Sequence, residues 1–231
     1  MSIAGQLAVV RDRIDRAARG CGRDPASVTL VAVSKTKGPD AIREAYAAGQ
    51  RAFGENYAQE LAAKATALAD LTDLEWHFIG HLQGNKAKVA AKHAQFVHTV
   101  DSAALARELG RRVEREGRSA PLPVLIEVNA MGERQKAGAT PSEIQEVMDA
   151  VRSERALALR GLMAIPPAGD LDAARKVFEL VGSLRSLHGG IAVLPELSMG
   201  MSADLEVAVA CGATMVRIGT AIFGERERRS A

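Results

Sequence analysis

Aromatic residues are scarce in this chain. They make up 3% of the 231 residues, whereas hydrophobic residues as a whole make up 47%. A core of ordinary size must therefore be built from aliphatic side chains. Basic tracts interleaved with aromatic residues, which are typical of nucleic-acid-binding surfaces, do not occur, and the formal net charge is only +2. We therefore expect no nucleic-acid partner.

Membrane and export signals are also missing from the sequence. No apolar run is long enough to span a bilayer, and residues 1–7 lack the charged segment and apolar stretch of a secretory signal. The two cysteines, Cys21 and Cys211, have no metal-binding or redox spacing, although a disulfide between them stays open. We expect a cytoplasmic protein without membrane contact. The low aromatic content and the lack of an evident apolar patch favour a monomer.

What the sequence does contain is a repeated alternation of short apolar strands and amphipathic helices. An amphipathic helix is predicted over 3–19, with Gly20 and Gly22 at its end. Strands are then predicted at 28–34, 51–54, 75–80, 95–100, 122–129, 158–165, 192–198 and 213–218. The intervening helices are predicted at 39–49, 57–69, 84–92, 102–116, 141–153, 170–187 and 202–211.

Strict alternation of strands and helices implies parallel pairing with right-handed crossovers. Eight units in this length predict a (β/α)8 TIM barrel with an extra N-terminal helix. A doubly wound open sheet is the alternative, and it is disfavoured because no Gly-x-Gly-x-x-Gly follows the first strand. No long linker interrupts the pattern, so we expect a single domain over residues 1–231.

A lysine follows the first predicted strand. Side chains alternate along a strand, so Val31, Val33 and Lys35 share one face, and Lys37 lies beyond the strand end and is expected to face solvent. A partly buried amine is costly to keep charged and can become a nucleophile. The alternative is a strand-end lysine whose ammonium simply reaches water.

Polar and glycine-rich residues gather after several other strands, where the working face of such a barrel is found. Residues 198–204 place two small hydroxyl side chains and a glycine at a predicted helix start, and in 217–224 the pair Gly219-Thr220 follows a predicted strand with another glycine at 224. Backbone N–H groups in such turns bind phosphate well, although glycines after strands can also simply make turns. Arg217 would point into the barrel mouth, where an ion pair with Glu127 or Glu196 is the structural explanation.

Two histidines, His77 and His81, could share the face of one strand as metal ligands. Gly80 separates them, and no third ligand follows at a suitable spacing, so we expect no metal site. His77 is better interpreted as a core histidine held by hydrogen bonds. His93, His98 and His188 are interpreted as surface or packing residues.

Six segments of the sequence resemble the pyridoxal phosphate homeostasis protein family, a group of single-domain barrels that bind pyridoxal 5'-phosphate. The resemblance extends over about residues 1–225, and its segments are 32–37, 53–57, 76–83, 160–165, 197–202 and 215–224. It implies a cofactor, pyridoxal 5'-phosphate, held by Lys35 as a Schiff base.

The resemblance also implies the other binding residues. Ser202, Gly219 and Thr220 would bind the phosphate, and Arg217 would face the pyridine nitrogen, as in the related alanine racemase barrel. The remaining pocket residues implied by the resemblance are Asn56, Met163, Ser198 and Met199. An arginine can only donate to the ring nitrogen, which leaves that nitrogen unprotonated and the ring a weak electron sink.

Two kinds of function fit this cofactor. The family implies a non-catalytic protein that buffers the cofactor or delivers it to apo-enzymes. The alternative is an amino-acid racemase, which would need a second base, and no second domain to supply one is expected before Ala231. The chain's tyrosines are Tyr46, predicted in the middle of a helix, and Tyr57, which could stand near the mouth. We therefore expect a carrier and no enzyme.

Overall fold

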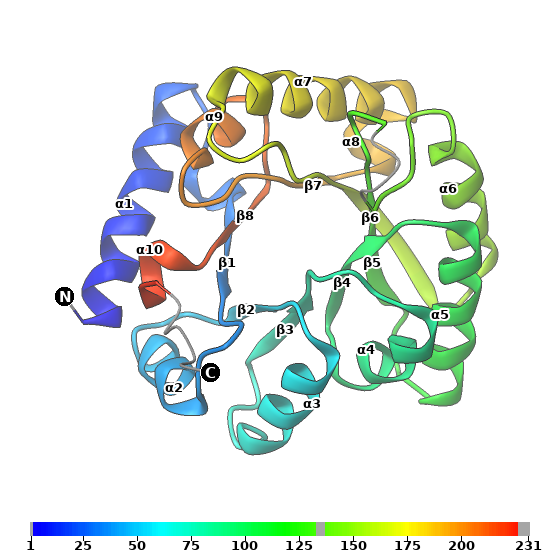
Figure 1. The fold of residues 1–231 in the computed structure, drawn as a ribbon, viewed down its shortest axis with the longest axis horizontal. Helices are drawn as coiled ribbons and strands as arrows, with labels where there is room; N and C mark the ends of the chain where they lie inside the picture. The colour runs from blue at the N-terminus through cyan, green and yellow to red at the C-terminus, as the bar shows by residue number, and fades with distance from the viewer. Residues whose placement is uncertain (1, 133–136, 226–231) are drawn as a thin grey trace, which may run out of the picture.

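Eight parallel strands close into a barrel in their sequence order (Figure 1). The structure is a computed structural model that describes residues 2–132 and 137–225. The predicted TIM barrel is confirmed. Its strands are β1 (Thr29–Val33), β2 (Ala52–Glu55), β3 (Glu75–Phe78), β4 (Phe96–Val100), β5 (Leu122–Glu127), β6 (Leu157–Met163), β7 (Glu196–Ser198) and β8 (Met215–Ile218).

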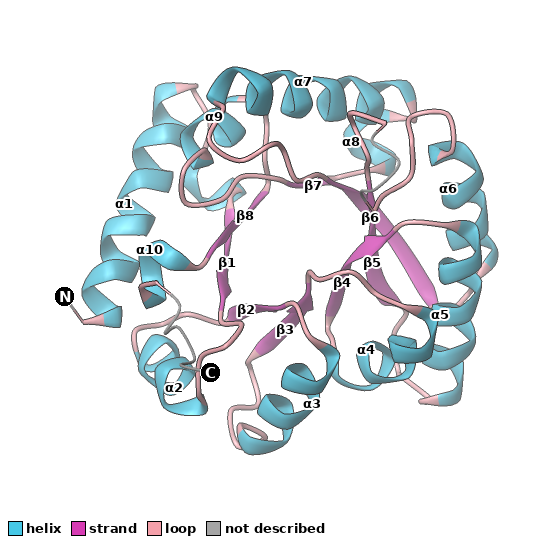
Figure 2. Ribbon diagram, in the orientation of Figure 1, coloured by secondary structure: helices cyan, strands magenta, loops and turns pink. Residues whose placement is uncertain are grey.

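Helices surround the barrel on its outside (Figure 2). The predicted N-terminal helix is confirmed as α1, which packs against α9 and α10 near the point where the barrel closes. The helices are α1 (Ile3–Gly20), α2 (Pro39–Ala47), α3 (Ala58–Ala67), α4 (Ala87–His93), α5 (Ala103–Arg115), α6 (Ile144–Ser153), α7 (Leu171–Leu187), α8 (Gly190–Val193), α9 (Leu205–Ala210) and α10 (Thr220–Phe223), with 3-10 turns η1 (Pro25–Ser27) and η2 (Gly84–Lys86).

The predicted strand at 192–198 is wrong at its start. Residues 190–193 form the short helix α8, and β7 begins only at Glu196. Gly189 and Gly190 both have positive φ, which turns the chain after α7, and Pro195 has no N–H to give to a strand ladder. The short helix α10, directly after β8, was not predicted either.

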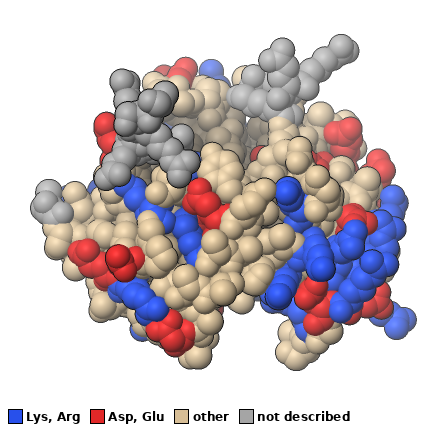
Figure 3. Space-filling view, turned by 60° about the horizontal axis from the view of Figure 1, so that its bottom comes forward, with Lys and Arg blue, Asp and Glu red and all other residues tan. Residues whose placement is uncertain are grey.

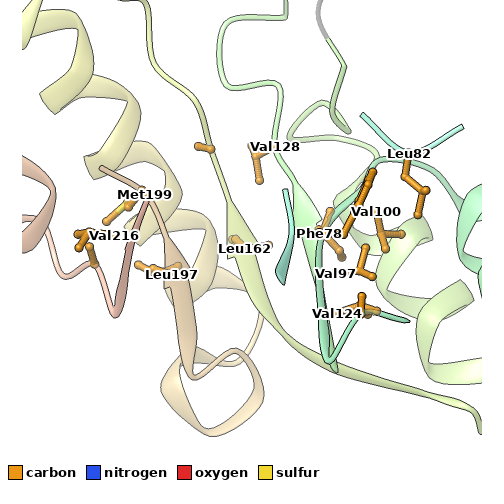
Figure 4. Close-up of a cluster of buried hydrophobic side chains, with 14 of the residues drawn as sticks. Phe78, Leu82, Val97, Val100, Val124, Val128, Leu162, Leu197, Met199 and Val216 are labelled. Atoms are coloured by element: carbon orange, nitrogen blue, oxygen red, sulfur yellow. The ribbon is translucent and has the colours of Figure 1, made fainter. Parts of the chain in front are cut away.

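Buried side chains form two layers on either side of the barrel wall. Leu30 and Ala32 of β1 belong to the large cluster between strands and helices. Val31 is equally buried but lies outside that cluster, because alternate side chains of the strand point into the barrel. The predicted facing of β1 is therefore confirmed. Part of the outer cluster is shown in Figure 4, where Leu197, Met199 and Val216 lie together.

Charged side chains of both signs intermingle on the face shown in Figure 3. Helix α5, for example, carries Arg111 and Arg112, which pair with Glu108 at 2.5 and 2.7 Å. Such exposed pairs contribute little stability, typically about 0–1 kcal/mol each. No helix in the part of the chain that the structure describes is both long and apolar enough to cross a membrane.

Gly80, after β3, is a position where the fold leaves no room for a side chain. A Cβ built on Gly80 would lie 2.0 Å from the carbonyl oxygen of Asn56, which follows β2.

We expect Gly80→Ala to lower the free energy of unfolding by about 2–4 kcal/mol, because the backbone must move to make room for the added methyl group. Urea denaturation measures this. Gly20→Ala is the matched control, since its Cβ would meet nothing within 4 Å; equal midpoints for the two variants would contradict the prediction.

Candidate functional site

A cavity of about 320 Å³ lies at the carboxyl ends of the strands, the face on which TIM barrels carry their sites. Its volume falls within the usual range for small-molecule sites. The lining combines two lysines, one arginine, one amide and several small residues with apolar ones. The lining residues are Val33, Lys35, Thr36, Lys37, Asn56, Ile79, Ile165, Met201, Ser202, Ala203, Arg217, Gly219, Thr220, Phe223 and Gly224.

Lys35 reaches this cavity from the end of β1. It is half-buried, and it continues the face of Val31 and Val33, which point into the barrel. Lys37, which was expected to face solvent, is half-buried: it lines the cavity, and its Nζ donates to the carbonyl oxygen of Glu225 at 3.1 Å in an exposed contact. Both lysines therefore line the same cavity.

Thr36, between the two lysines, has a strained backbone. Its φ is 66°, and it is the one residue other than glycine with positive φ among residues 2–132 and 137–225. A left-handed conformation costs an L-residue roughly 1–2 kcal/mol, and a β-branched residue adopts it especially rarely. Strain of this kind persists only when surrounding contacts hold it.

The pairing of β1 with β8 brings the lysines next to residues far away in sequence. Val31 is in register with Arg217, and Ala32 with Ile218. The following Gly219 lies so close to β1 that a Cβ on it would sit 3.2 Å from the carbonyl oxygen of Val33. A side chain at this position would press on the strand that carries Lys35.

Arg217 is almost fully buried, with 4% of its surface exposed, and it forms no ion pair with Glu127 or Glu196 within the described residues. Its Nη1 donates to the carbonyl and hydroxyl oxygens of Ser198, both at 2.7 Å, and its Nη2 donates to the carbonyl oxygen of Ala164 at 3.0 Å. Burial lowers the pKa of Arg217 to about 10, so the guanidinium stays charged at neutral pH. These contacts use three of five N–H bonds, which leaves donors for a group in the cavity.

A line of buried hydrogen bonds continues from Arg217 beneath the cavity. The Ser198 hydroxyl lies 2.8 Å from Nδ1 of His98, and Nε2 of His98 lies 2.8 Å from Nδ1 of His77. Burial, reinforced by the electrostatic influence of the neighbouring His77 and Arg217, holds the pKa of His98 well below its usual value. Since Arg217 only donates, neutral His98 can accept from Ser198 and donate to His77.

The interpretation of His77 as a hydrogen-bonded core histidine is confirmed: 3% of its surface is exposed. His98, interpreted as a surface or packing residue, is instead a buried link in this line. The side chain of His81 is exposed and lies 3.6 Å from Asp101. In the described residues, no three His, Cys, Asp or Glu side chains are grouped so that they could hold a metal ion.

Two turns supply the small residues of the cavity. Ser202 and Ala203 lie between β7 and α9, while Gly219 joins β8 to α10 and Thr220 is the first residue of α10. The first N–H groups of α10 have no acceptor within the helix. The β7–α9 turn is tied to α1, because Arg13 donates to the carbonyl oxygen of Ser202 at 3.0 Å and pairs with Glu206 at 2.7 Å.

Asn56, which follows β2 next to β1, also lines the cavity, and its Oδ1 is buried without a hydrogen-bond partner among the described residues. A buried acceptor without a partner is costly unless a ligand or water supplies a donor. The neighbouring Tyr57, which was considered as a residue near the mouth, is 49% exposed and does not line the cavity.

Three residues implied by the resemblance are not part of the cavity lining. Met163 and Ser198 are fully buried beneath it, and Ser198 contacts Arg217 instead. Met199 points away, into the cluster between strands and helices (Figure 4). It directly follows β7, so the alternation that turns one neighbour inward turns this side chain outward.

Comparisons with known proteins place this barrel in a family. The profile described as "Alanine racemase, N-terminal domain" matches residues 6–227. The Pyridoxal phosphate homeostasis protein of Pseudomonas aeruginosa is 49% identical, over 98% of this chain and 96% of that protein. That of Escherichia coli K12 is 47% identical, over 97% of each chain. The chain belongs to the pyridoxal phosphate homeostasis protein family.

Solved structures agree with this assignment. PipY of Synechococcus elongatus with PLP bound is 39% identical, with a TM-score of 0.83 over 96% of this chain and 100% of that chain. The alanine racemase of Corynebacterium glutamicum is 19% identical, with a TM-score of 0.66 over 95% of this chain and 62% of that chain. The second likeness is one of fold alone.

Several residues that line the cavity were not predicted from the sequence. Ile79 and Ile165 are apolar residues just after β3 and β6, and Phe223 lies in the unpredicted helix α10. A signal existed for the first two, because they directly precede Gly80 and Pro166 at strand ends. No such signal marked Phe223, which reaches the cavity only because α10 turns the chain back over it.

Glu127, at the end of β5, lines an adjoining cavity of about 370 Å³ that shares Ile165 with the first. It is 8% exposed, and its Oε2 has no hydrogen-bond partner within residues 2–132 and 137–225. Burial, reinforced by the charge of Asp101 and opposed by that of Arg217, raises the pKa of Glu127 to about 7. This carboxyl group therefore titrates near neutral pH beside the cavity.

Glu127 should make the folded state less stable as the pH rises. A raised pKa means that the folded chain holds this proton more tightly than the unfolded chain. The proton therefore stabilises the folded state fully below pH 4.5, and this stabilisation is lost as the pH rises toward 7. We expect wild type to lose up to roughly 3 kcal/mol relative to Glu127→Gln across this window. Urea midpoints at several pH values measure the difference. The exposed Glu146→Gln should follow wild type, and parallel curves for wild type and Glu127→Gln would refute the prediction.

Proposed function

We propose that this chain binds pyridoxal 5'-phosphate in the 320 Å³ cavity and holds it through Lys35. The observation that carries the proposal is the meeting of an amine, a buried guanidinium and two small-residue turns on one cavity, from segments about 180 residues apart. The PLP-bound structure of PipY, a family member of the same fold, supports it.

Lys35 would supply the bond. Its amine would condense with the cofactor's aldehyde to a Schiff base, with loss of one water, and this would require the amine in its neutral form. Lys35 is half-buried and lines the cavity, so the amine would meet the aldehyde there.

Ser202, Gly219 and Thr220 would bind the phosphate. A hydroxyl and the first N–H groups of α10 are suitable donors for a dianion, and the absent side chain at Gly219 leaves the backbone open to it. Asn56 lines the same cavity, and its buried Oδ1 could accept from a donor on the bound cofactor. The residues present therefore fit the cofactor.

Arg217 would donate to the pyridine nitrogen, and Ser198 and His98 hold the guanidinium in place. When bound, pyridoxal 5'-phosphate supplies an electron sink for reactions of amino acids. A donor that is charged at neutral pH opposes protonation of the ring nitrogen and so weakens that sink. The chain's own residues thus favour holding the cofactor over using it.

The physiological role that we propose is cofactor homeostasis without catalysis, by a single-domain, monomeric, cytoplasmic protein that buffers pyridoxal 5'-phosphate and delivers it to apo-enzymes. The curated relatives from Pseudomonas aeruginosa and Escherichia coli carry the name Pyridoxal phosphate homeostasis protein, which supports this role. A racemase-like enzyme is the second candidate, favoured only by the shared fold with alanine racemase.

Covalent attachment should be specific to one lysine. We expect wild type mixed with pyridoxal 5'-phosphate to absorb near the visible edge, and borohydride to fix the cofactor onto Lys35 because reduction makes the imine permanent. Peptide mass spectrometry locates the label. Lys37→Ala is the matched control and should keep the label, since both lysines line the same cavity. A label retained by Lys35→Ala would contradict the assignment.

Isotope exchange separates the carrier from the racemase. We expect α-deuterated amino acids to lose deuterium in the presence of the protein no faster than with free pyridoxal 5'-phosphate, because the ring nitrogen is held unprotonated. Mass spectrometry of the amino acid measures the loss. Faster exchange with wild type that disappears in Lys35→Ala would favour the racemase instead.

A further inference from the structure

A buried group of charged side chains lies directly behind Lys35, on the far face of β1 from the cavity. Lys64 of α3 is 6% exposed, and its Nζ donates to the carbonyl oxygen of Ser34, to Glu55 Oε1 and to Glu60 Oε2, each at 2.8 Å. All three ammonium hydrogens are thereby used. Ser34 Oγ donates to the same Glu55 oxygen at 2.6 Å.

This group holds the backbone on both sides of Lys35. The carbonyl of Ser34, which accepts from Lys64, belongs to the peptide that precedes Lys35. The N–H of Thr36, which donates to Glu60 Oε2 at 2.7 Å, belongs to the peptide that follows Lys35. Since Lys64 and Glu60 also bind each other, one unit fixes both peptide planes of the lysine. We call Glu60 and Lys64 the clamp.

The clamp acts on the strained residue of the site. Thr36 is the residue held at a φ of 66°, and its N–H is the group that Glu60 accepts. Without this acceptor, relaxation to negative φ would lower the conformational energy of Thr36. That rotation would turn the Lys35–Thr36 peptide and redirect the Lys35 side chain.

Stability alone is a poor explanation for the clamp. Lys64 and Glu55 are both removed from water, Glu55 completely, and Glu55 Oε2 has no hydrogen-bond partner. Burial raises the pKa of Glu55 despite its contact with Lys64, so desolvation outweighs the ion pair there. Apolar residues of similar volume often give the folded state equal stability at such a position.

We propose that Glu60 and Lys64 are positioning residues, which hold Thr36 in its left-handed conformation and thereby aim the Lys35 amine into the cavity. This inference rests on the proposed function for its role with pyridoxal 5'-phosphate. The positioning itself is a property of the chain alone.

Two ligands distinguish positioning from general damage. Pyridoxal 5'-phosphate can bond to Lys35, whereas pyridoxine 5'-phosphate carries an alcohol in place of the aldehyde and cannot. We expect Glu60→Ala to weaken formation of the borohydride-reducible imine about tenfold, the factor that matches the strain of one left-handed residue. Affinity for pyridoxine 5'-phosphate should stay at the wild-type value. Equal losses for both ligands would overturn the proposal.

Conservative variants sharpen this test. Glu60→Gln keeps an oxygen that can accept from Thr36, so it should recover part of the imine that Glu60→Ala loses. Glu55→Gln combined with Lys64→Met removes the ion pair without leaving a buried carboxylate unpaired, and should behave like Glu60→Ala. In a Thr36→Gly background the strain is absent, so Glu60→Ala should cost much less. An undiminished loss there would overturn the role of strain.

A measurement without ligand separates this inference from the proposed function. In the unliganded chain we expect the Thr36 amide to exchange with deuterium faster in Glu60→Ala than in wild type, because its acceptor is gone. Glu108→Gln, which removes a surface charge on α5, is the control and should leave this exchange unchanged. A wild type that binds neither ligand would refute the proposed function, whereas unchanged Thr36 exchange in Glu60→Ala would refute the clamp.

Discussion

The pairing of β1 with β8 is the contact on which the site depends. It closes the barrel, and it sets Val31 beside Arg217, so that the end of the first strand meets the end of the last. The chain between them folds as strand–helix units that also contact this meeting point, since Glu60 of α3 accepts from Thr36 and Ser198 of β7 accepts from Arg217. Gly219 lies against Val33, where a Cβ would sit 3.2 Å from the carbonyl oxygen, so the closure leaves little room for a larger residue at this edge of the cavity.

Charge inside the barrel is the second constraint. Arg217, Glu127 and His98 are all buried. The Arg217 guanidinium donates to neutral oxygens, burial favours the neutral form of His98, and burial raises the pKa of Glu127 to about 7. A buried polar group usually costs stability unless it is satisfied. Arg217 and Glu127 line two adjoining cavities, so these costly groups gather where a ligand could bind.

Much of the fold could be predicted because its signals are local. Strands such as Thr29–Val33 are short aliphatic runs, and helices such as Ala103–Arg115 carry both an apolar face and a capping serine, Ser102, before their first turn. The one strand whose start was misplaced, β7, has three residues and follows a glycine pair and a proline. With so few residues, periodicity cannot separate a strand from a helical turn.

The predicted site residues likewise fall into two groups, those that line the cavity and those that do not. The family resemblance implied binding roles for Lys35, Asn56, Ser202, Arg217, Gly219 and Thr220, and all line one cavity. Met163, Ser198 and Met199 were predicted with them, yet all three side chains lie outside the lining, because a side chain's direction depends on the register and on the last peptide of its strand.

The amino-acid sequence by itself determined the order of strands and helices, the face of β1 that turns inward and the family to which the chain belongs, since these follow from patterns within short segments. Only the tertiary structure decided that Ser198 and His98 support Arg217, that Glu127 keeps its proton to near neutral pH, and that Glu60 and Lys64 hold the backbone around Lys35. These properties depend on distances between residues of different strands and helices and on the exclusion of water from between them. Neither exists until the barrel is closed.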